Sequence, residues 1–168
     1  MMCHMAVPSF WMSILRRQAL TLGDAFANRY AHDWLVWEAG PWLPATSLGE
    51  SAMLKTVLPG AEQALRPTAS DAVCYPLWPD ASTGELLVGR ATTNHLILND
   101  LTVSRLAFRL LRVDGWQLVP ESPNVSLPGA SDGPVTLVSG QLVRVGDVRL
   151  TFLSVPALLE RLRLQTAS

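Results

Sequence analysis

An antiparallel β-sandwich is the fold class that the second half of this 168-residue sequence predicts, in a protein that is mainly β. Short apolar runs recur there at spacings of roughly 8–12 residues, and each is bounded by Gly, Asn, Asp, Pro or Ser. Two of these boundaries, Asp114-Gly115 and Gly146-Asp147, are tight-turn signals, because glycine adopts positive φ without steric cost. No helical periodicity interrupts the runs until the end of the chain.

The expected strands follow from these runs, taken in order along the chain. They are residues 85–88, 96–98, 106–113, 116–119, 135–138, 142–145 and 148–153. The turn signals join 106–113 to 116–121, and 142–145 to 148–153, as two hairpins. In the last strand Val148, Leu150 and Phe152 alternate with polar residues, so we expect these three side chains to face the core.

The first seventy residues differ from the rest and are rich in tryptophan. Residues 10–19 and 22–31 are expected to form helices, the second capped by Thr21, with Asp24 completing a capping-box-like start. Residues 34–37 have the apolar sequence of a strand. Four of the six tryptophans lie in this extension, at Trp11, Trp34, Trp37 and Trp42.

Two further elements complete the expected extension. Residues 50–58 predict a helix that ends at Pro59-Gly60, and residues 66–70 read as a linker into the sandwich. An apolar extension of this kind either packs on the sandwich or offers a docking surface, and the sequence leaves both open.

The chain closes on a short amphipathic helix. Four apolar residues fall at i, i+3, i+4 and i+7: Val155, Leu158, Leu159 and Leu162. Covering an edge of its own sandwich is favoured over binding a partner, because exposed sheet edges need covering. The predicted organisation is therefore a helical, Trp-rich extension over 1–70, a β-sandwich over 72–155, and a helix with its tail over 156–168.

Composition and charge exclude several classes of function. The net charge is −1, from 13 basic and 14 acidic residues, so no overall field favours nucleic acid or an anionic membrane. No run is long enough to cross a membrane, and the N-terminus lacks the pattern of a secretory signal. We therefore expect a cytoplasmic protein.

Catalysis and metal binding are not expected either. Cys3 and Cys74 make neither a disulfide framework nor a metal-ligand pattern. The histidines, His4, His32 and His95, are scattered, and none has a partner at the spacing of a catalytic triad or metal site. The prediction is a non-enzyme without metal or cofactor.

Polar residues occupy the loops between the predicted strands. They are Gly89-Arg90, Asn94, Ser104-Arg105 and the run Ser122-Pro123-Asn124-Val125-Ser126. A β scaffold would bring these loop tips to one end, where they form a candidate anion-binding edge.

These loops and strands together resemble a known family. The sequence carrying the likeness runs from Leu87-Val88-Gly89-Arg90, through Asn94 to Leu98, Val103 to Phe108 and Ser122 to Ser126, and closes on 142–152. In order and spacing it resembles a forkhead-associated (FHA) domain, over about residues 72–155. The resemblance implies an FHA-type β-sandwich, of bacterial origin, that binds phosphothreonine peptides on loops at one end.

The resemblance also implies roles for individual residues. Arg90 stands where the family's arginine approaches the phosphate, and Ser104 where its serine donates to a phosphate oxygen. Arg105 adds a second positive charge, and Asn124 stands where an asparagine holds the backbone of the bound peptide. Two serines flank Asn124: Ser122, and Ser126 in place of the family's usual threonine.

Two positions depart from the family's pattern. Ala107 stands where the family has a histidine that braces the binding loops. Val125 stands where it has a glycine, and a β-branched residue disfavours positive φ. The loop after Asn124 is therefore expected to take a different path, and Pro123 stiffens it.

Three functions remain open. The first is an adaptor that binds a phosphothreonine-containing protein downstream of its serine/threonine kinase. The second is a structural or assembly protein that has lost phosphate dependence and self-associates through the Trp-rich extension. The third is a non-catalytic subunit that regulates an enzyme.

Overall fold

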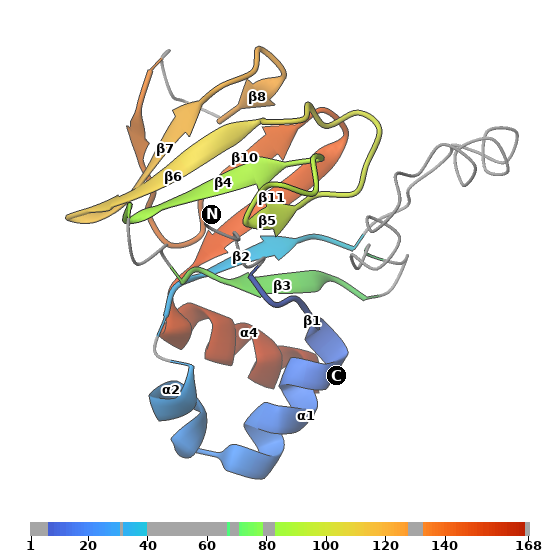
Figure 1. The fold of residues 1–168 in the computed structure, drawn as a ribbon. Coiled ribbons are helices and arrows are strands. Elements are labelled where there is room, and N and C mark those ends of the chain that lie inside the picture. Colours follow the sequence, from blue (N-terminus) through green and yellow to red (C-terminus); the bar gives the residue numbers. More distant parts are fainter. Residues whose placement is uncertain are drawn as a thin grey trace, which may run out of the picture.

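Two β-sheets face each other, and helices cover the outer face of the larger sheet (Figure 1). The structure is a computed structural model, and it describes residues 7–30, 32–39, 67, 71–78, 83–127 and 133–166. Within these ranges the helices are α1 (Met12–Leu22), α2 (Ala25–Arg29) and α4 (Val155–Thr166). The protein therefore has three layers, namely sheet, sheet and helices.

The larger sheet has the strand order β1-β3-β2-β11-β10-β8, and its neighbouring strands are antiparallel. The strands are β1 (Phe10–Trp11), β2 (Trp34–Trp37), β3 (Val73–Pro76), β8 (Val125–Ser126), β10 (Leu142–Val145) and β11 (Val148–Leu153). The second predicted hairpin is confirmed, since β10 pairs with β11 across the turn at Gly146, where φ is +58°.

The smaller sheet has the order β5-β4-β6-β7-β9. Its strands are β4 (Glu85–Gly89), β5 (Leu96–Ile97), β6 (Phe108–Val113), β7 (Gly115–Pro120) and β9 (Val135–Thr136). The first predicted hairpin, β6 with β7, is confirmed, and so is the mainly β, two-sheet fold class. The antiparallel prediction was wrong for one pair, because β4 and β5 run parallel.

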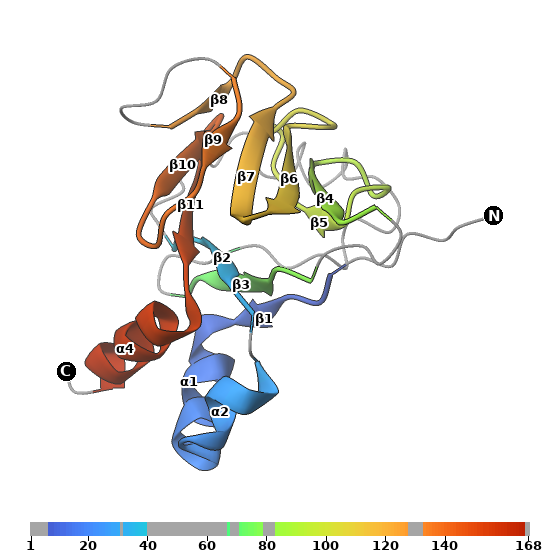
Figure 2. The ribbon, with the colours of Figure 1, turned by 90° about the vertical axis from the view of Figure 1, so that its left-hand side faces the viewer.

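The main hydrophobic core lies between the two sheets (Figure 2). Val148, Leu150 and Phe152 all belong to it, as their alternation predicted. The smaller sheet adds Phe108, Leu110 and Trp116, among others. This core holds the two sheets together and so fixes the loops at their ends.

Strand β2, from the Trp-rich extension, lies inside the larger sheet between β3 and β11. All four of its residues are buried, Leu35 and Trp37 on the inter-sheet side and Trp34 and Val36 on the helix side. An unbroken apolar run is what a strand covered on both faces requires. The predicted domain boundary at residues 70–72 therefore separates β2 from β3 along the chain, although these two strands are neighbours in one sheet.

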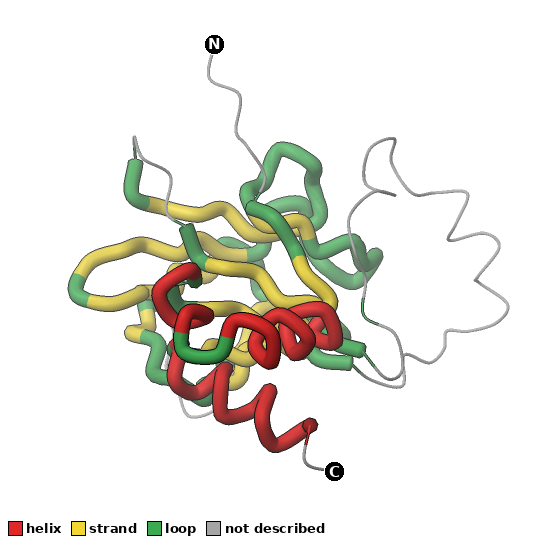
Figure 3. The backbone as a smooth tube through the Cα atoms, turned by 90° about the horizontal axis from the view of Figure 1, so that it is seen from below, coloured by secondary structure: helices red, strands yellow, loops and turns green. Residues whose placement is uncertain are grey.

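A second hydrophobic core separates the larger sheet from the helices. The rings of Phe10, Phe26, Tyr30 and Trp34 meet there with centroids 4.9–6.1 Å apart. Seen from the helix side, the described helices lie in front of the strands (Figure 3). Of the two alternatives for the extension, packing on the sandwich applies to its described residues between 10 and 37. They contribute strands to the larger sheet and helices to the layer that covers it.

The predicted helix over 22–31 was wrong at its start. Thr21 lies inside α1, where its hydroxyl donates to the Arg17 carbonyl, so it caps nothing. Gly23, with φ of +55°, ends α1, and Asp24 makes no side-chain capping bond to the short α2 that follows. The first helix, predicted over 10–19, begins two residues later and ends three residues later than predicted.

The N-terminus of α1 is capped by a residue far along the chain. Trp11, at the cap position, makes no side-chain capping bond. Instead the Asp71 carboxylate accepts from the Ser13 amide at 3.1 Å and from the Ser13 hydroxyl at 2.6 Å. A carboxylate at a helix N-terminus satisfies unpaired amides and suits the helix dipole.

Helix α4 covers a sheet face, whereas the sequence predicted an edge. Leu158 and Leu162 are buried in the second core, and Val155 and Leu159 pack partly against it. The preference for self-packing over partner binding is therefore confirmed for this face of the helix.

Several expectations lie outside the described residues. They concern the helix over 50–58, its stop at Pro59-Gly60, most of the 66–70 linker, Trp42, Cys3 and His4. Within the described ranges, the helices lack the length and apolar character that a membrane crossing requires.

Candidate functional site

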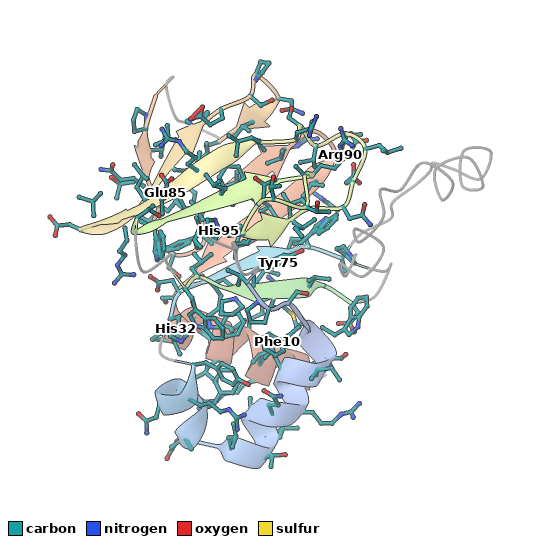
Figure 4. All side chains as sticks on the ribbon, in the orientation of Figure 1. Phe10, His32, Tyr75, Glu85, Arg90 and His95 are labelled. Carbon is teal, nitrogen blue, oxygen red and sulfur yellow. The ribbon has the colours of Figure 1, made fainter. Side chains whose placement is uncertain are left out.

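Three loops and one hairpin turn meet at one end of the sandwich. They are the loop after β4, the loop from β5 to β6, the loop before β8, and the turn between β10 and β11. Figure 4 shows Arg90 on these loops, on the far side of the larger sheet from the helices. The predicted convergence of polar loop tips is present, and its contacts define the candidate site.

Arg90 is anchored to the loop that carries Ser104. Its backbone amide donates to the Ser104 carbonyl at 3.0 Å, and its Nε donates to the Val103 carbonyl at 3.1 Å. The guanidinium is thus oriented by the neighbouring loop, and its two terminal amino groups extend beyond the anchored Nε. An arginine held in this way can present a forked donor to an anion.

Three side chains from two loops form a compact hydrogen-bonded cluster. The Ser104 and Ser122 hydroxyl oxygens lie 2.6 Å apart, and both hydroxyls reach the Asn124 Oδ1, that of Ser104 at 3.3 Å. We call Ser104, Ser122 and Asn124 the hydroxyl cluster. Serine hydroxyls rotate freely, so the two can redirect their protons to an incoming acceptor.

Asn124 also ties the cluster to the loop from β5 to β6. Its Nδ2 donates to the Thr102 carbonyl at 2.8 Å, while its own carbonyl accepts from the Gly146 amide at 3.1 Å. The Thr102 hydroxyl in turn accepts from the Asp147 amide at 2.9 Å. Asn124 therefore fastens together the loops of the site, a role that its assignment to peptide binding did not include.

Thr102 is held in place by a local carboxylate. Asp100, which is nearly buried, accepts from the Thr102 amide at 2.8 Å and from its hydroxyl at 2.6 Å. This is the side-chain-to-backbone bonding typical of an Asx turn. The turn presents the Thr102 carbonyl to Asn124.

Asn94 performs a similar function on the other side of Arg90. It is buried, and its Nδ2 donates to the Arg105 carbonyl at 2.6 Å and to the Ala91 carbonyl at 3.0 Å. The Ala91 amide donates to the same Arg105 carbonyl at 3.1 Å. Asn94 thus joins the loop carrying Arg90 to the loop carrying Ser104.

The two departures from the family pattern fit this structure in different ways. Ala107 is fully buried, and its backbone bonds to Val88 and Glu121 within the smaller sheet. The bracing of the loops comes from Asn94 and Asn124. Val125 lies in β8, paired with Val145, and no non-glycine residue in the described ranges has positive φ. Val125 thus begins a strand directly after Asn124.

The remaining predicted site residues lie at the margin. The Arg105 side chain is exposed beside Ser104, while its carbonyl is used by Asn94 and Ala91. Ser126 is exposed in β8 opposite Arg144, outside the contacts that form the hydroxyl cluster. The structure therefore brings together Arg90, Ser104, Ser122 and Asn124.

Sequence reasoning assigned no role to Thr102 or Gly146 in the site. At Gly146 an added Cβ would meet the Thr102 hydroxyl at 2.6 Å, so the hairpin turn and the loop touch through a glycine. Residues 102 and 146 are 44 positions apart, and a loop threonine and a turn glycine show no sequence pattern that predicts a contact between them. Asn94 was part of the predicted polar pattern, but nothing in the sequence indicated that it joins the two loops.

No metal or thiol chemistry is evident in the described residues. Within those ranges no group of three or more His, Cys, Asp or Glu side chains could hold a metal ion. Burial raises the pKa of the Cys74 thiol far above its ordinary value, which keeps it protonated and unreactive. The chemistry that the site offers is hydrogen bonding to an anion.

Among known proteins, the chain shows similarity to solved structures. No protein-family model and no curated protein matches the chain. An FHA domain studied for its phosphothreonine-dependent interactions is 22% identical with a TM-score of 0.42, over 48% of this chain and 82% of that one. The FHA domain of the CT664 protein from Chlamydia trachomatis is 19% identical with a TM-score of 0.42, over 48% and 84%.

A further similar structure is the MEK1 FHA domain in complex with a HOP1 phosphothreonine peptide. It is 17% identical with a TM-score of 0.40, over 49% of this chain and 88% of that chain. These similar structures are FHA domains, the family that the loop residues resemble in sequence.

Proposed function

We propose that this chain is a phosphothreonine-peptide-binding module. The observation that carries the proposal is the joining of Arg90 to the hydroxyl cluster, since the Arg90 amide donates to Ser104, whose hydroxyl lies 2.6 Å from that of Ser122. One arginine and two hydroxyls on braced loops form a set of donors suited to a phosphate.

The chemistry of phosphothreonine matches these donors. Its phosphate carries roughly −1.5 to −2 charges at pH 7 and accepts several charge-assisted hydrogen bonds. Arg90 and Arg105 supply positive charge, and Ser104 and Ser122 supply hydroxyl donors. Because the overall charge of the chain is −1, attraction to a phosphate must come from this local arrangement.

Bracing of the loops supports affinity as well as specificity. Asn94 and Asn124 hold the loops before any ligand arrives, so less ordering entropy is lost on binding. In this proposal Asn124 keeps its bond to Thr102 and offers peptide contacts from a fixed position. Arg105 and Ser126 border the site and contact the peptide beyond the phosphate.

The wider role that follows is that of a non-catalytic adaptor. Its partner would be a protein phosphorylated on threonine by a serine/threonine kinase, and both would meet it in the cytoplasm. The sandwich domain over 72–155 carries the site, and residues from the extension complete its larger sheet.

A second candidate, phosphate-independent assembly, draws support from the hydroxyl cluster itself. Its members already satisfy one another, so the loops can be stable without a ligand. Trp34 and Trp37 of the extension are buried in the two cores, so self-association would not use these two tryptophans. Any such interface would use other residues.

A phosphopeptide library screen tests the first candidate. Binding of a selected peptide should vanish on dephosphorylation, and Arg90→Ala or Ser104→Ala should cost about 1.5–3 kcal/mol, the range for hydrogen bonds to charged groups. That loss is roughly 10- to 150-fold in Kd. Isothermal titration calorimetry measures it.

The control is Arg17→Ala, which removes an exposed arginine from α1, away from the loops, and should leave Kd unchanged. Equal affinity for phosphorylated and unphosphorylated peptides would reject phosphate recognition. A library with no binders, together with a full-chain oligomer, would favour assembly.

A further inference from the structure

An apolar groove lies between the exposed sides of α1 and α4, on the side of the molecule away from Arg90. Its volume is about 460 Å³, and its walls carry Ala19 and Leu20 from α1 and Leu159 and Leu162 from α4. Leu162 is recessed, at 1% exposure, whereas Leu20 is 66% exposed. The groove therefore has an apolar floor and one projecting apolar side chain on its rim.

A second hollow lies on the opposite side of α1. It measures about 280 Å³, and its lining includes Ile14, Leu22 and two arginines, Arg17 and Arg29. Residues 16, 19, 20 and 23 line the first hollow and 14, 17, 18, 21 and 22 the second, which are opposite sides of one helix at 3.6 residues per turn. The outer ridge of α1 thus stands between two depressions.

Positive charge borders both depressions. Arg163 lies on the α4 wall of the groove, and Arg17 and Arg29 line the second hollow; all three side chains are exposed. Against them, the helices and their described connections contribute three carboxylates, Asp24, Asp33 and Glu160, and Asp33 is paired with Arg112. Arginine is therefore concentrated here in a chain whose overall charge is −1.

The shape of the surface favours a helix as the occupant. A groove between two helices accepts a third helix by packing ridges into grooves, and an amphipathic helix presents its apolar side chains at i, i+3, i+4 and i+7. Membrane insertion would need apolar side chains that project, and here Leu20 projects while the other apolar lining residues are buried or half-buried.

We propose that this surface binds an acidic amphipathic helix of a partner protein. The apolar face of that helix contacts Leu20 and the groove floor, and its flanking carboxylates meet Arg163 and Arg17. This surface lies away from the loops that carry Arg90 (Figure 4), so the chain can hold a phosphothreonine peptide and the acidic helix at the same time.

A displayed library of helical peptides tests the proposal on the full-length protein. The library fixes leucines at helical spacing over about four turns and varies the flanking positions among Glu, Gln and Lys. Selection should enrich Glu, and the selected peptide should bind Leu20→Asp and Arg163→Glu at least about tenfold more weakly by fluorescence anisotropy.

Matched controls separate this surface from general effects. Val113→Asp places a charge on another exposed apolar residue, 59% exposed, and Arg144→Glu reverses an exposed arginine on β10; both should bind like the unchanged protein. All four substitutions are at exposed side chains, and thermal unfolding should show equal stability.

Three results would overturn the proposal. They are enrichment of Lys or Gln in place of Glu, equal weakening by the control variants, or stronger binding to phosphatidylserine vesicles than to any selected peptide with the same dependence on Leu20. Because none of these measurements uses a phosphopeptide, their outcome is independent of the proposed phosphothreonine site.

Discussion

Gly89 shows how one missing side chain allows the site to form. A Cβ at this position would lie well inside contact distance of the Arg105 carbonyl oxygen and 2.9 Å from the Asn94 Nδ2. The two loops can therefore approach only because residue 89 has no side chain. The glycine precedes Arg90, so the close approach also determines where the arginine emerges.

We expect Gly89→Ala to weaken phosphopeptide binding by moving these loops apart. Overpacking of a tight contact costs about 1–3 kcal/mol of stability. The measurements are the free energy of unfolding from urea titration and the Kd of a selected phosphopeptide. Thr93→Ala, an exposed change in the same loop, is the control. Unchanged stability and Kd in Gly89→Ala would show that the loops tolerate separation.

At the residue scale, the sequence predicted which residues lie at the site better than it predicted their hydrogen-bond partners. Arg90, Ser104, Ser122 and Asn124 were all placed at one edge, and the structure brings them together. Their hydrogen-bond partners, chiefly backbone carbonyls such as that of Thr102, were not predicted. Every residue has a carbonyl, so sequence gives no indication of which one is used.

At the scale of elements, the ion pair between Arg161 and Glu38 ties α4 to the larger sheet. The Arg161 guanidinium donates two hydrogen bonds to the Glu38 carboxylate, at 2.5 and 2.7 Å. Thr151 of β11 donates to the same carboxylate at 2.6 Å. The pair joins the residue after β2 to β11 and to the C-terminal helix.

Protonation of Glu38 should loosen this connection. Burial raises the pKa of Glu38, but hydrogen bonds from Arg161 and Thr151 and the charges of Arg161 and Arg149 outweigh it, so the pKa is lowered from 4.5. A carboxyl group whose pKa is lower in the folded state than in the unfolded state contributes its full stabilisation when the pH is above the unfolded-state pKa. That stabilisation is lost as the pH falls through the folded pKa.

Glu38→Gln should therefore lower the free energy of unfolding by about 1.5–3 kcal/mol at neutral pH. The difference from the unchanged protein should shrink in acid, where the native carboxyl is itself protonated. Urea titrations across this pH range measure it. Glu85→Gln, in a more exposed pair with Arg109, is the control and should cost under about 1 kcal/mol. A loss independent of pH would contradict the ionic explanation.

Helix boundaries illustrate what local sequence misses at this scale. The sequence favoured Thr21 as a cap because threonine followed by an acid three positions later is a common start signal. In the structure the capping carboxylate of α1 belongs to Asp71, 58 residues from Ser13. A cap supplied from across the chain leaves no trace in the local pattern.

At the scale of the whole molecule, the described part of the extension contributes a strand to the interior of the larger sheet. Strand β2 pairs with β3 on one side and with β11 on the other. Without β2, β3 and β11 would each lose one of their two neighbouring strands, and both cores would lose side chains that β2 buries in them.

Deleting residues 1–39 should therefore abolish cooperative folding of the sandwich. Thermal unfolding followed by circular dichroism in the near ultraviolet measures this. In the full chain, Trp34→Ala should cost about 3–5 kcal/mol, because it empties a fully buried site. The same change at Trp78, which is 38% exposed, is the control. A folded, phosphopeptide-binding fragment over 40–168 would contradict this view.

The sequence by itself determined the two-sheet β architecture, both hairpins and the polar residues gathered at one edge of the sandwich. These features depend on local periodicity and turn residues, which each short segment carries alone. Only the tertiary structure decided that β2 lies inside the larger sheet, that Asp71 caps α1, and that Asn94 and Asn124 brace the loops. These are pairings between distant segments, and they form only when burial of the two cores brings those segments together.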